Sequence, residues 1–348
     1  MTGAASVCGS GRGGTYGGMT AAPVPHHTAE AQRVVAELSA AFSAKVVGQE
    51  HLRESLLIGL LTGGHVLLES VPGLAKTTAA RVIAESIDGR FRRIQCTPDL
   101  LPSDIIGTQI YDASTASFVT QLGPVHANVV LLDEINRSSA KTQSAMLEAM
   151  EERQTTIAGT VYPIDEPFLV IATQNPVDQE GTYALSEAQT DRFLIKEIVR
   201  YPSPEEEVEV LIRRDTGLYD RGHRTRPVAT LDDIRQVQRV AAEVHLSRDL
   251  MLYASRLVGV TRDAERYLPS HVARVVEYGA SPRATIALCT AARALALLSG
   301  RTHVLPGDIA DLAHRVLQHR LILSFEAAST GVTPGRVIDA ALGAVRVP

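Results

Sequence analysis

The chain has 348 residues, of which 45% are hydrophobic and 21% are charged, and its formal net charge is −5 at pH 7. This length is enough for two domains with their own cores, and the mild acidic excess argues against a dedicated nucleic-acid binder, which usually carries a basic surface. No apolar run is long enough to span a membrane, and the three cysteines lack the paired spacing of a disulfide or zinc site. We therefore expect a cytoplasmic protein.

The N-terminal segment up to about residue 28 is rich in glycine and small polar residues and has no apolar core typical of a signal peptide. Such a composition cannot bury enough apolar surface to fold, so we expect a disordered tail over residues 1–28. The remaining chain is predicted to form two domains, an α/β core over residues 29–202 and a helical domain over residues 203–348.

The first predicted strand covers residues 65–69 and leads into a short loop, Ser70-Val71-Pro72-Gly73-Leu74-Ala75-Lys76-Thr77, ahead of a helix-compatible segment. This context is typical of a phosphate-binding P-loop, in which backbone N–H groups at a helix N-terminus face a phosphate. Lys76 would neutralise phosphate oxygens and Thr77 would ligate Mg²⁺. Ser70 and Ala75 replace glycines of the strict pattern, but both are small. An ordinary Pro-Gly turn is the alternative. The predicted phosphate-binding set is Pro72, Gly73, Leu74, Ala75, Lys76, Thr77 and Thr78.

Further strands are predicted over residues 91–96 and 129–133, and the second of these ends in two acids, Asp133 and Glu134. A continuous apolar run is typical of a buried parallel strand, and ligands bind at the carboxyl ends of such strands. Asp133 would organise the Mg²⁺ shell, and Glu134 would polarise the attacking water. A core strand that merely ends at a polar turn is the alternative, but the order of P-loop and acidic strand indicates an NTPase.

The strand predicted over residues 168–173 is followed by a polar amide, Asn175, which could align water and γ-phosphate or could simply begin a turn before Pro176. Further along, Arg192 could stabilise transition-state charge or could pair with Asp191 or Glu187 on a helix surface. Arg283 follows Pro282 at a predicted helix start, where the helix dipole disfavours a cation unless a phosphate is bound nearby.

Together these motifs closely resemble the MoxR family of AAA+ ATPases over about residues 29–348. The resemblance rests on the P-loop, on Gly123-Pro124, on Leu131-Leu132-Asp133-Glu134-Ile135-Asn136-Arg137, on the segment from Leu185 to Phe193, and on Gly279-Ala280-Ser281-Pro282-Arg283-Ala284. It implies that Asn175 is sensor 1, that Arg192 is an arginine finger reaching a neighbouring subunit, and that Arg283 is sensor 2. It also implies that the segment containing Val47, Gly48 and Gln49 packs beside the adenine.

Strands alternating with helical patterns, including a last strand over residues 194–199, predict a parallel sheet with helices on both faces. Two insertions, over residues 108–121 and 154–164, are predicted to be exposed hairpins. Their aromatic residues Tyr111, Phe118 and Tyr162 have no evident partner in the sheet. In the family such inserts face a ring pore or a substrate, whereas inert surface hairpins are equally compatible with the sequence.

A linker signal at Tyr201-Pro202-Ser203-Pro204 precedes a predicted all-α lid, with helices over residues 231–244, 248–260, 283–299 and 306–319. Ser203 is suited to cap a helix that begins at Pro204. The lid is expected to bring Arg283 over the nucleotide. His314 and His319 are expected to be solvated at a basic helix end rather than to bind a metal.

The resemblance implies ATP and Mg²⁺ as ligands, a homo-oligomeric ring, most simply a hexamer, and remodelling or maturation of client proteins, often with a von Willebrand factor A domain partner. Two other classes are weighed against this. A GTPase is disfavoured because the chain lacks an Asn-Lys-x-Asp run that would read guanine, and a small-molecule kinase is disfavoured because it has no need for an all-α lid with a second phosphate sensor. A nucleotide-switched scaffold, or a motor subunit of a chelatase-like or nucleic-acid-remodelling complex, is disfavoured if Glu134, Asn175 and Arg192 are functional.

Overall fold

The computed structural model describes residues 26–176, 183–217 and 225–348. The predicted tail lies outside these ranges except for its last residues, because the first helix, α1 (His26–Lys45), begins at His26 rather than near residue 29. The prediction of disorder for residues 1–25 therefore stays a prediction.

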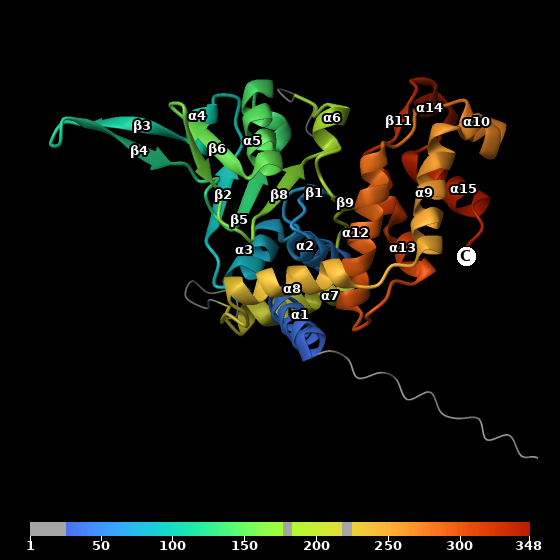
Figure 1. The fold of residues 1–348 in the computed structure, drawn as a ribbon, viewed down its shortest axis with the longest axis horizontal. Coiled ribbons are helices and arrows are strands. Elements are labelled where there is room, and N and C mark those ends of the chain that lie inside the picture. The colour runs from blue at the N-terminus through green and yellow to red at the C-terminus, as the bar shows by residue number, and fades with distance from the viewer. Residues whose placement is uncertain (1–25, 177–182, 218–224) are drawn as a thin grey trace, which may run out of the picture.

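The centre of the molecule is a five-stranded parallel sheet with the order β2-β5-β8-β1-β9 (Figure 1). Its strands are β1 (Val66–Glu69), β2 (Phe91–Gln95), β5 (Val129–Asp133), β8 (Leu169–Gln174) and β9 (Ile195–Ile198). All five strands predicted from the sequence are confirmed, and each end lies within one residue of the predicted position. Parallel strands that are buried on both faces appear in the sequence as continuous apolar runs, and such runs therefore predicted the positions of these strands.

Helices cover both faces of this sheet, as predicted. The helices of this part of the chain after α1 are α2 (Glu50–Thr62), α3 (Lys76–Ser86), α4 (Pro102–Ile106), the 3-10 turn η1 (Ile135–Arg137), α5 (Ala140–Glu152) and α6 (Glu187–Thr190). Successive strand residues point to opposite faces: Leu131 packs in one apolar cluster with α2 and α3, whereas its neighbours Val130 and Leu132 pack in the other with α5.

A buried histidine ties α5 to the start of β1. The His65 ring lies within hydrogen-bond distance of Met150 O through Nε2, at 3.1 Å, and its Nδ1 accepts the Val170 N–H at 3.1 Å. Burial lowers the pKa of His65 to about 4, so the ring is neutral at pH 7 and Nε2 carries the proton that it donates to Met150. This contact places the C-terminal end of α5 at the amino edge of the sheet.

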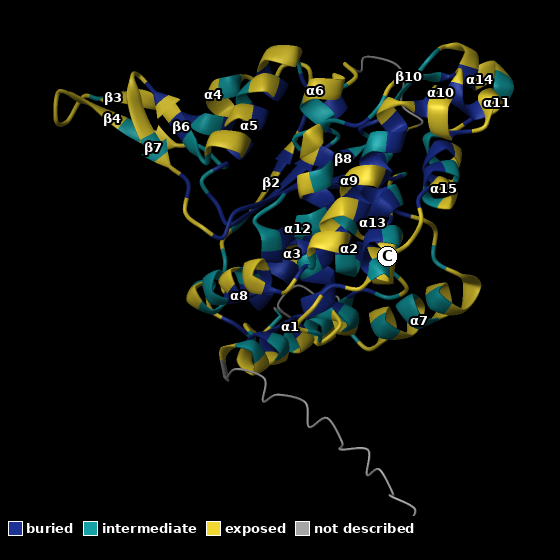
Figure 2. Ribbon diagram, turned by 45° about the vertical axis from the view of Figure 1, so that its right-hand side comes forward, coloured by how far each residue is buried: buried dark blue, intermediate teal, exposed yellow. Residues whose placement is uncertain are grey.

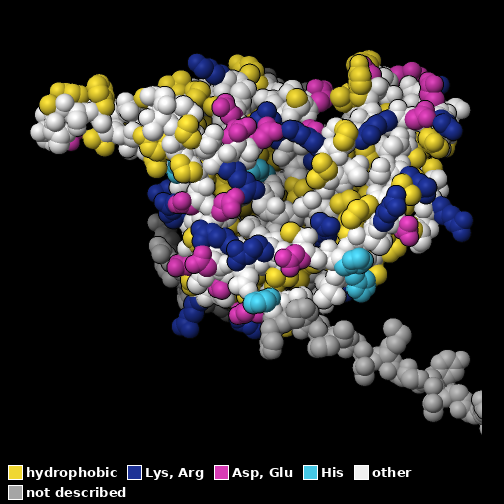
Figure 3. Space-filling view, in the orientation of Figure 1, with side chains coloured by type: hydrophobic (Ala, Val, Ile, Leu, Met, Phe, Trp, Pro, Cys, Tyr) yellow, Lys and Arg dark blue, Asp and Glu magenta, His cyan; other side chains and the backbone are white. Residues whose placement is uncertain are grey.

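Both predicted insertions form hairpins, β3 (Gly107–Asp112) with β4 (Ser117–Leu122) and β6 (Gln154–Ile157) with β7 (Thr160–Pro163). The β3–β4 hairpin projects from the body as an arm, and hydrophobic side chains are visible on it (Figures 1 and 3). Tyr111 and Phe118 face each other at its end and are 56% and 67% exposed. Tyr162 does have a partner, since its hydroxyl lies 2.8 Å from Thr120 Oγ1. The hydrogen bond joins the two hairpins.

The C-terminal part is helical, as predicted, with one addition. Its helices are α7 (Pro204–Asp215), α8 (Leu231–Glu243), α9 (Arg248–Arg262), α10 (Ala264–Tyr267), α11 (Ser270–Ala273), α12 (Pro282–Leu298), α13 (Pro306–Leu317), α14 (Glu326–Thr330) and α15 (Pro334–Ala344). A short antiparallel pair, β10 (Val276–Tyr278) and β11 (Ile322–Leu323), is the departure from an all-α lid. Ser203 accepts the Glu206 N–H and caps α7, as expected. No helix in the described ranges has the length and apolar character that a membrane span requires.

The lid shares its core with the α/β domain. Buried residues of α2 and α3 belong to the same apolar cluster as those of α9, α12 and α13, and Figure 2 shows this buried interior as continuous. The boundary proposed between residues 202 and 203 therefore marks the change from an α/β pattern to a helical pattern in the sequence. The hydrophobic core continues across it.

The prediction for His319 was wrong. The residue is only partly exposed, with its Nδ1 atom buried and its Nε2 3.1 Å from Phe193 O, and desolvation holds the pKa of the ring well below the usual value. His319 follows α13, and packing of α13 against β9 brings the ring against the α/β part. His314 is half-exposed and contacts Asp339 at 2.9 Å.

Candidate active site

The P-loop connects the carboxyl end of β1 to α3, which begins at Lys76. Two positive backbone angles shape it, with φ of 90° at Gly73 and 54° at Ala75. A side chain in this left-handed region costs roughly 1 to 2 kcal/mol, and the small Ala75 accepts the turn that the strict motif gives to glycine. The unpaired N–H groups of the first turn of α3 are therefore presented at the loop.

The Lys76 ammonium folds back over this loop. Its Nζ donates to Ser70 O at 3.4 Å and to Val71 O at 3.3 Å. Burial lowers the pKa of Lys76, and the opposing attraction of Asp133 and Glu134 partly offsets that effect. The cation thus stands between the loop and the two acids.

Asp133 is buried at the end of β5, and a threonine of the next strand holds it. Thr173 Oγ1 donates to Asp133 Oδ1 at 2.8 Å and accepts the Glu134 N–H at 2.8 Å. Glu134 itself adopts a positive φ of 57°, a conformation that non-glycine residues rarely take outside functional or tightly constrained positions. The Thr173 hydroxyl therefore fixes both acids at once.

A cavity of about 290 Å³ brings the predicted phosphate-site residues together. Its lining contains the whole predicted loop set, both acids and the sensor candidate, namely Pro72, Gly73, Leu74, Ala75, Lys76, Thr77, Thr78, Asp133, Glu134 and Asn175. Segments separated by up to about a hundred residues meet here because the carboxyl ends of neighbouring parallel strands share one edge.

Two lining residues, Arg93 and Gln95, were not predicted from the sequence. Both lie on β2, which pairs with β5 so that Gln95 is opposite Asp133. Gln95 Nε2 donates to Glu134 Oε2 at 3.2 Å, and Arg137 Nη1 contacts the same oxygen at 3.2 Å. Polar residues at alternate positions of β2 could have indicated these two side chains. That pattern points to the site only if β2 is known to pair with β5.

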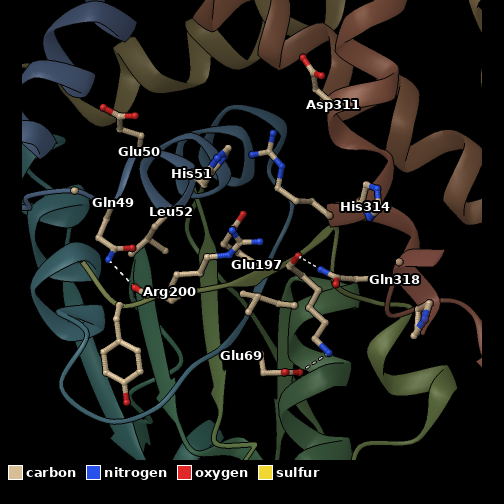
Figure 4. A pocket seen from close by; sticks show the side chains of 18 of the residues that line it. Gln49, Glu50, His51, Leu52, Glu69, Glu197, Arg200, Asp311, His314 and Gln318 are labelled. Carbon is tan, nitrogen blue, oxygen red and sulfur yellow. Dashed lines mark hydrogen bonds and ion pairs between the residues drawn. The ribbon is translucent and has the colours of Figure 1, made fainter. Parts of the chain in front are cut away.

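A larger cavity of about 760 Å³ lies between the core and the lid (Figure 4). Gly48 and Gln49 line it, as does Glu69 at the end of β1, immediately before the P-loop. Gln49 Nε2 donates to Arg200 O at 3.1 Å, and α13 closes the opposite side with residues that include Asp311 and His314. This volume lies in the range typical of small-molecule sites. Val47, the third residue predicted beside the adenine, is not among the lining residues.

A charged network joins the lid to the core behind the wall of this cavity, which Arg315 and Glu197 line. Arg315 of α13 contacts Glu54 Oε1 at 2.5 Å and donates to Ser55 Oγ at 3.2 Å. Ser55 in turn donates to the buried Glu197 at 2.6 Å, and burial raises the pKa of that carboxyl group. None of these residues belonged to the predicted site.

Arg192 and Arg283 lie away from the P-loop cavity and share one carboxylate. Arg192 contacts Glu151 Oε2 at 3.1 Å and Arg283 contacts Glu151 Oε1 at 2.7 Å. Pairing of Arg192 with Asp191 or Glu187, the alternative from the sequence, is not observed. Arg283 does not line the P-loop cavity of its own chain, because α12 begins beside the C-terminal end of α5, so its expected place over a nucleotide stays a prediction.

The two arginines lie at the amino edge of the sheet, whereas the P-loop lies at its carboxyl edge. Arg192 precedes β9, the P-loop follows β1, and the strands run parallel with Val66 opposite Ile195. Four strand residues separate these edges by about 13 Å before the loops are added. Asp191 anchors this segment to the lid by accepting from Arg320 Nε at 2.7 Å and from Ser281 Oγ at 3.0 Å.

The donor set of the P-loop cavity is suited to Mg²⁺. The Thr77 hydroxyl and the Asp133 carboxylate line the same open space, and this ion prefers oxygen ligands and keeps several waters. Both residues were predicted as its ligands.

Comparison with known proteins agrees with this geometry. The model of the ATPase family associated with various cellular activities (AAA) matches residues 65–195, and an AAA lid domain model matches residues 269–341. The chaperone MoxR1 of Mycobacterium tuberculosis is 45% identical over 97% of this chain and 91% of its own length. The protein MoxR of Paracoccus denitrificans is 32% identical over 90% of this chain and 96% of its own.

A solved structure is similarly close. A protein of Cytophaga hutchinsonii that is classed as an ATPase superposes with a TM-score of 0.86 at 42% identity, covering 92% of this chain and 97% of the other. By these similarities, the chain belongs to the MoxR family of AAA+ ATPases.

Proposed function

We propose that this protein hydrolyses ATP at sites completed by two neighbouring chains of a ring. The observation that carries the proposal is the separation of Arg192 and Arg283 from the chain's own P-loop. The phosphate cavity contains a loop, a cation and two acids, but both arginines lie at the opposite edge of the sheet on Glu151. Charge stabilisation by these arginines therefore requires the phosphate cavity of another copy.

The cavity residues that were predicted from the sequence have roles that follow from their positions. The N–H groups of the P-loop and Lys76 bind the phosphates, and Thr77 and Asp133 hold the Mg²⁺ that neutralises phosphate charge. Glu134 accepts a proton from the attacking water, and Asn175 orients that water. The adenosine portion occupies the larger cavity beside Gly48 and Gln49, which the P-loop adjoins through Glu69.

A head-to-tail contact that joins the amino edge of one sheet to the carboxyl edge of the next forms a closed ring if the rotation between copies closes. Resemblance to the family favours six copies. Arg192 and Arg283 then act on the neighbour's nucleotide rather than on their own, and Glu151 holds them until that neighbour is in place.

We further propose that hydrolysis in the cytoplasm drives remodelling or maturation of a client protein. Support comes from the relative named as a chaperone and from the exposed aromatic pair on the β3–β4 arm. A von Willebrand factor A domain partner follows from family resemblance alone. The rival function, a nucleotide-switched scaffold or a motor subunit of a chelatase-like or nucleic-acid-remodelling complex, has less support because the acids and their holding network are intact.

Steady-state ATPase assays over a wide range of protein concentration test the proposal. Specific activity per chain should rise with concentration and then reach a plateau, in parallel with assembly measured by analytical ultracentrifugation. A chain that hydrolyses ATP equally well when dilute and monomeric would contradict the shared site. Binding without turnover at every concentration would favour the scaffold.

The arm offers a test of client engagement. Replacing both Tyr111 and Phe118 by Ser should leave the melting temperature and basal ATPase close to wild type, since exposed substitutions usually change stability by about 0.5 kcal/mol or less. Client capture or client-stimulated ATPase should fall, because an exposed aromatic pair can grip an apolar segment. Stimulation at the wild-type level by a client would contradict a role for the arm, and Ser114→Ala in the hairpin turn is the matched control.

A further inference from the structure

Arg93 occupies a position that the proposed catalytic roles do not explain. It lies on β2, the edge strand of the sheet, on the same face as Gln95, and β2 pairs with β5 so that Arg93 is opposite Leu131. Its side chain is 48% exposed and lines the P-loop cavity. The strand neighbour Arg92 points to the other face and lines a different hollow, beside Arg90 and His126.

The guanidinium of Arg93 is bonded to one particular oxygen of Asp133. Nη2 lies 2.5 Å and Nε lies 3.1 Å from Asp133 Oδ2. The other oxygen, Oδ1, already accepts the Thr173 hydroxyl on the buried side at 2.8 Å. The oxygen that faces the cavity, and that a metal in the cavity would approach, is therefore the oxygen that Arg93 contacts.

Two cations that contact this one oxygen repel each other, which raises the free energy of the site. A divalent ion in the Asp133 shell would stand a few ångströms from the guanidinium, and like charges at that separation repel strongly even where water screens them. Arg93 can leave, because its side chain is half-exposed on an edge strand and Nη2 is otherwise held by a hydrogen bond to Gln95 Oε1 at 3.0 Å. Asp133 cannot leave, because it is buried and tied to Thr173.

We propose that Arg93 is an exchangeable counter-ion of Asp133. It neutralises the carboxylate when no metal is present, and it is displaced when Mg²⁺ enters with the nucleotide, so it sets the magnesium concentration at which the site loads. Its departure also releases Gln95, whose amide donates to Glu134 at 3.2 Å, so metal entry is coupled to the side chain that activates water. This inference rests on the proposed assignment of Asp133 to the metal shell.

The test is the magnesium dependence of nucleotide binding, which does not depend on turnover. Fluorescence anisotropy of a hydrolysis-resistant, fluorescent ATP analogue gives its Kd at free Mg²⁺ concentrations from EDTA to several millimolar. In Arg93→Gln the midpoint of the magnesium effect should move to at least about threefold lower Mg²⁺, because the competing cation is gone. Arg93→Lys, which keeps a charge but loses the two-pronged contact, should lie between Arg93→Gln and wild type.

Arg92→Gln is the matched control, since it removes the same charge from the same strand on the opposite face, and its midpoint should equal that of wild type. An unchanged or higher midpoint in Arg93→Gln would overturn the proposal. So would weaker binding by the same factor at every Mg²⁺ concentration, EDTA included, because that result would make Arg93 a phosphate ligand. If nucleotide binding by the wild type did not depend on magnesium at all, the assignment of Asp133 to the metal shell would be wrong. The proposal for Arg93, which rests on that assignment, would be wrong with it.

Discussion

Replacing Glu134 by Gln should abolish ATP turnover while leaving ATP binding intact. The amide keeps the size of the side chain and can still accept from Gln95 and Arg137, but it cannot take a proton from water. Loss of a positioned general base lowers the rate by about 10²- to 10⁴-fold. Turnover is measured by phosphate release, and binding by titration calorimetry with ATP.

Glu148→Gln is the matched control, because Glu148 is an exposed carboxylate on α5 and should behave as wild type in both assays. Asp133→Asn should differ from Glu134→Gln by losing the magnesium dependence of binding as well as turnover, since Asp133 is assigned to the metal. Turnover at the wild-type rate in Glu134→Gln would require another base in the cavity.

Mixing two inactive variants should restore activity if Arg192 acts on a neighbour. Arg192→Ala removes a cation whose role as an arginine finger is worth about 10³- to 10⁵-fold in rate, and Lys76→Ala removes the cation that binds phosphates. Each should be inactive alone. In a random equimolar ring, about one interface in four pairs an intact P-loop with an intact Arg192, so roughly a quarter of wild-type activity should return.

The control mixture is Lys76→Ala with Glu134→Gln, in which no interface has an intact P-loop and an intact general base, so activity should stay absent. Subunit exchange is verified by energy transfer between labelled chains. If the mixture of Lys76→Ala and Arg192→Ala exchanges subunits but stays inactive, Arg192 does not act on a neighbour. Its role would then be the structural ion pair with Glu151. Arg283→Ala mixed with Lys76→Ala should also recover activity, because Arg283 shares that carboxylate with Arg192.

The parts of the site that lie close together in the chain could be predicted without the structure. A P-loop is a strand, a tight turn and a helix start in sequence, so its residues and their order carry the geometry. Asp133 and Glu134 end an apolar run, and the carboxyl edge of a parallel sheet is where such ends meet. Local pattern also predicted the five strands, the two hairpins and the helical lid, because alternation and capping act over a few residues.

Other features depend on which strands and helices are neighbours, and no local pattern carries that information. Arg93 reaches Asp133 only because β2 pairs with β5 in a particular register. Glu151 is one of several acids on α5, and it is singled out because the end of that helix meets both Arg192 and Arg283.

The same reason explains the expectations that the structure corrected. His319 has the sequence context of a solvated residue at a helix end, but packing of α13 against β9 partly buries it. Arg283 lies at a helix start as predicted, and the tertiary structure adds that this start lies at the amino edge of the sheet, on Glu151. Sequence by itself therefore determined the family and the fold class, and it supplied the proposed phosphate-site residues, since these lie in contiguous motifs. Only the tertiary structure decided the charge partners of those motifs and the edge of the sheet that each arginine faces, because both depend on contacts between distant segments.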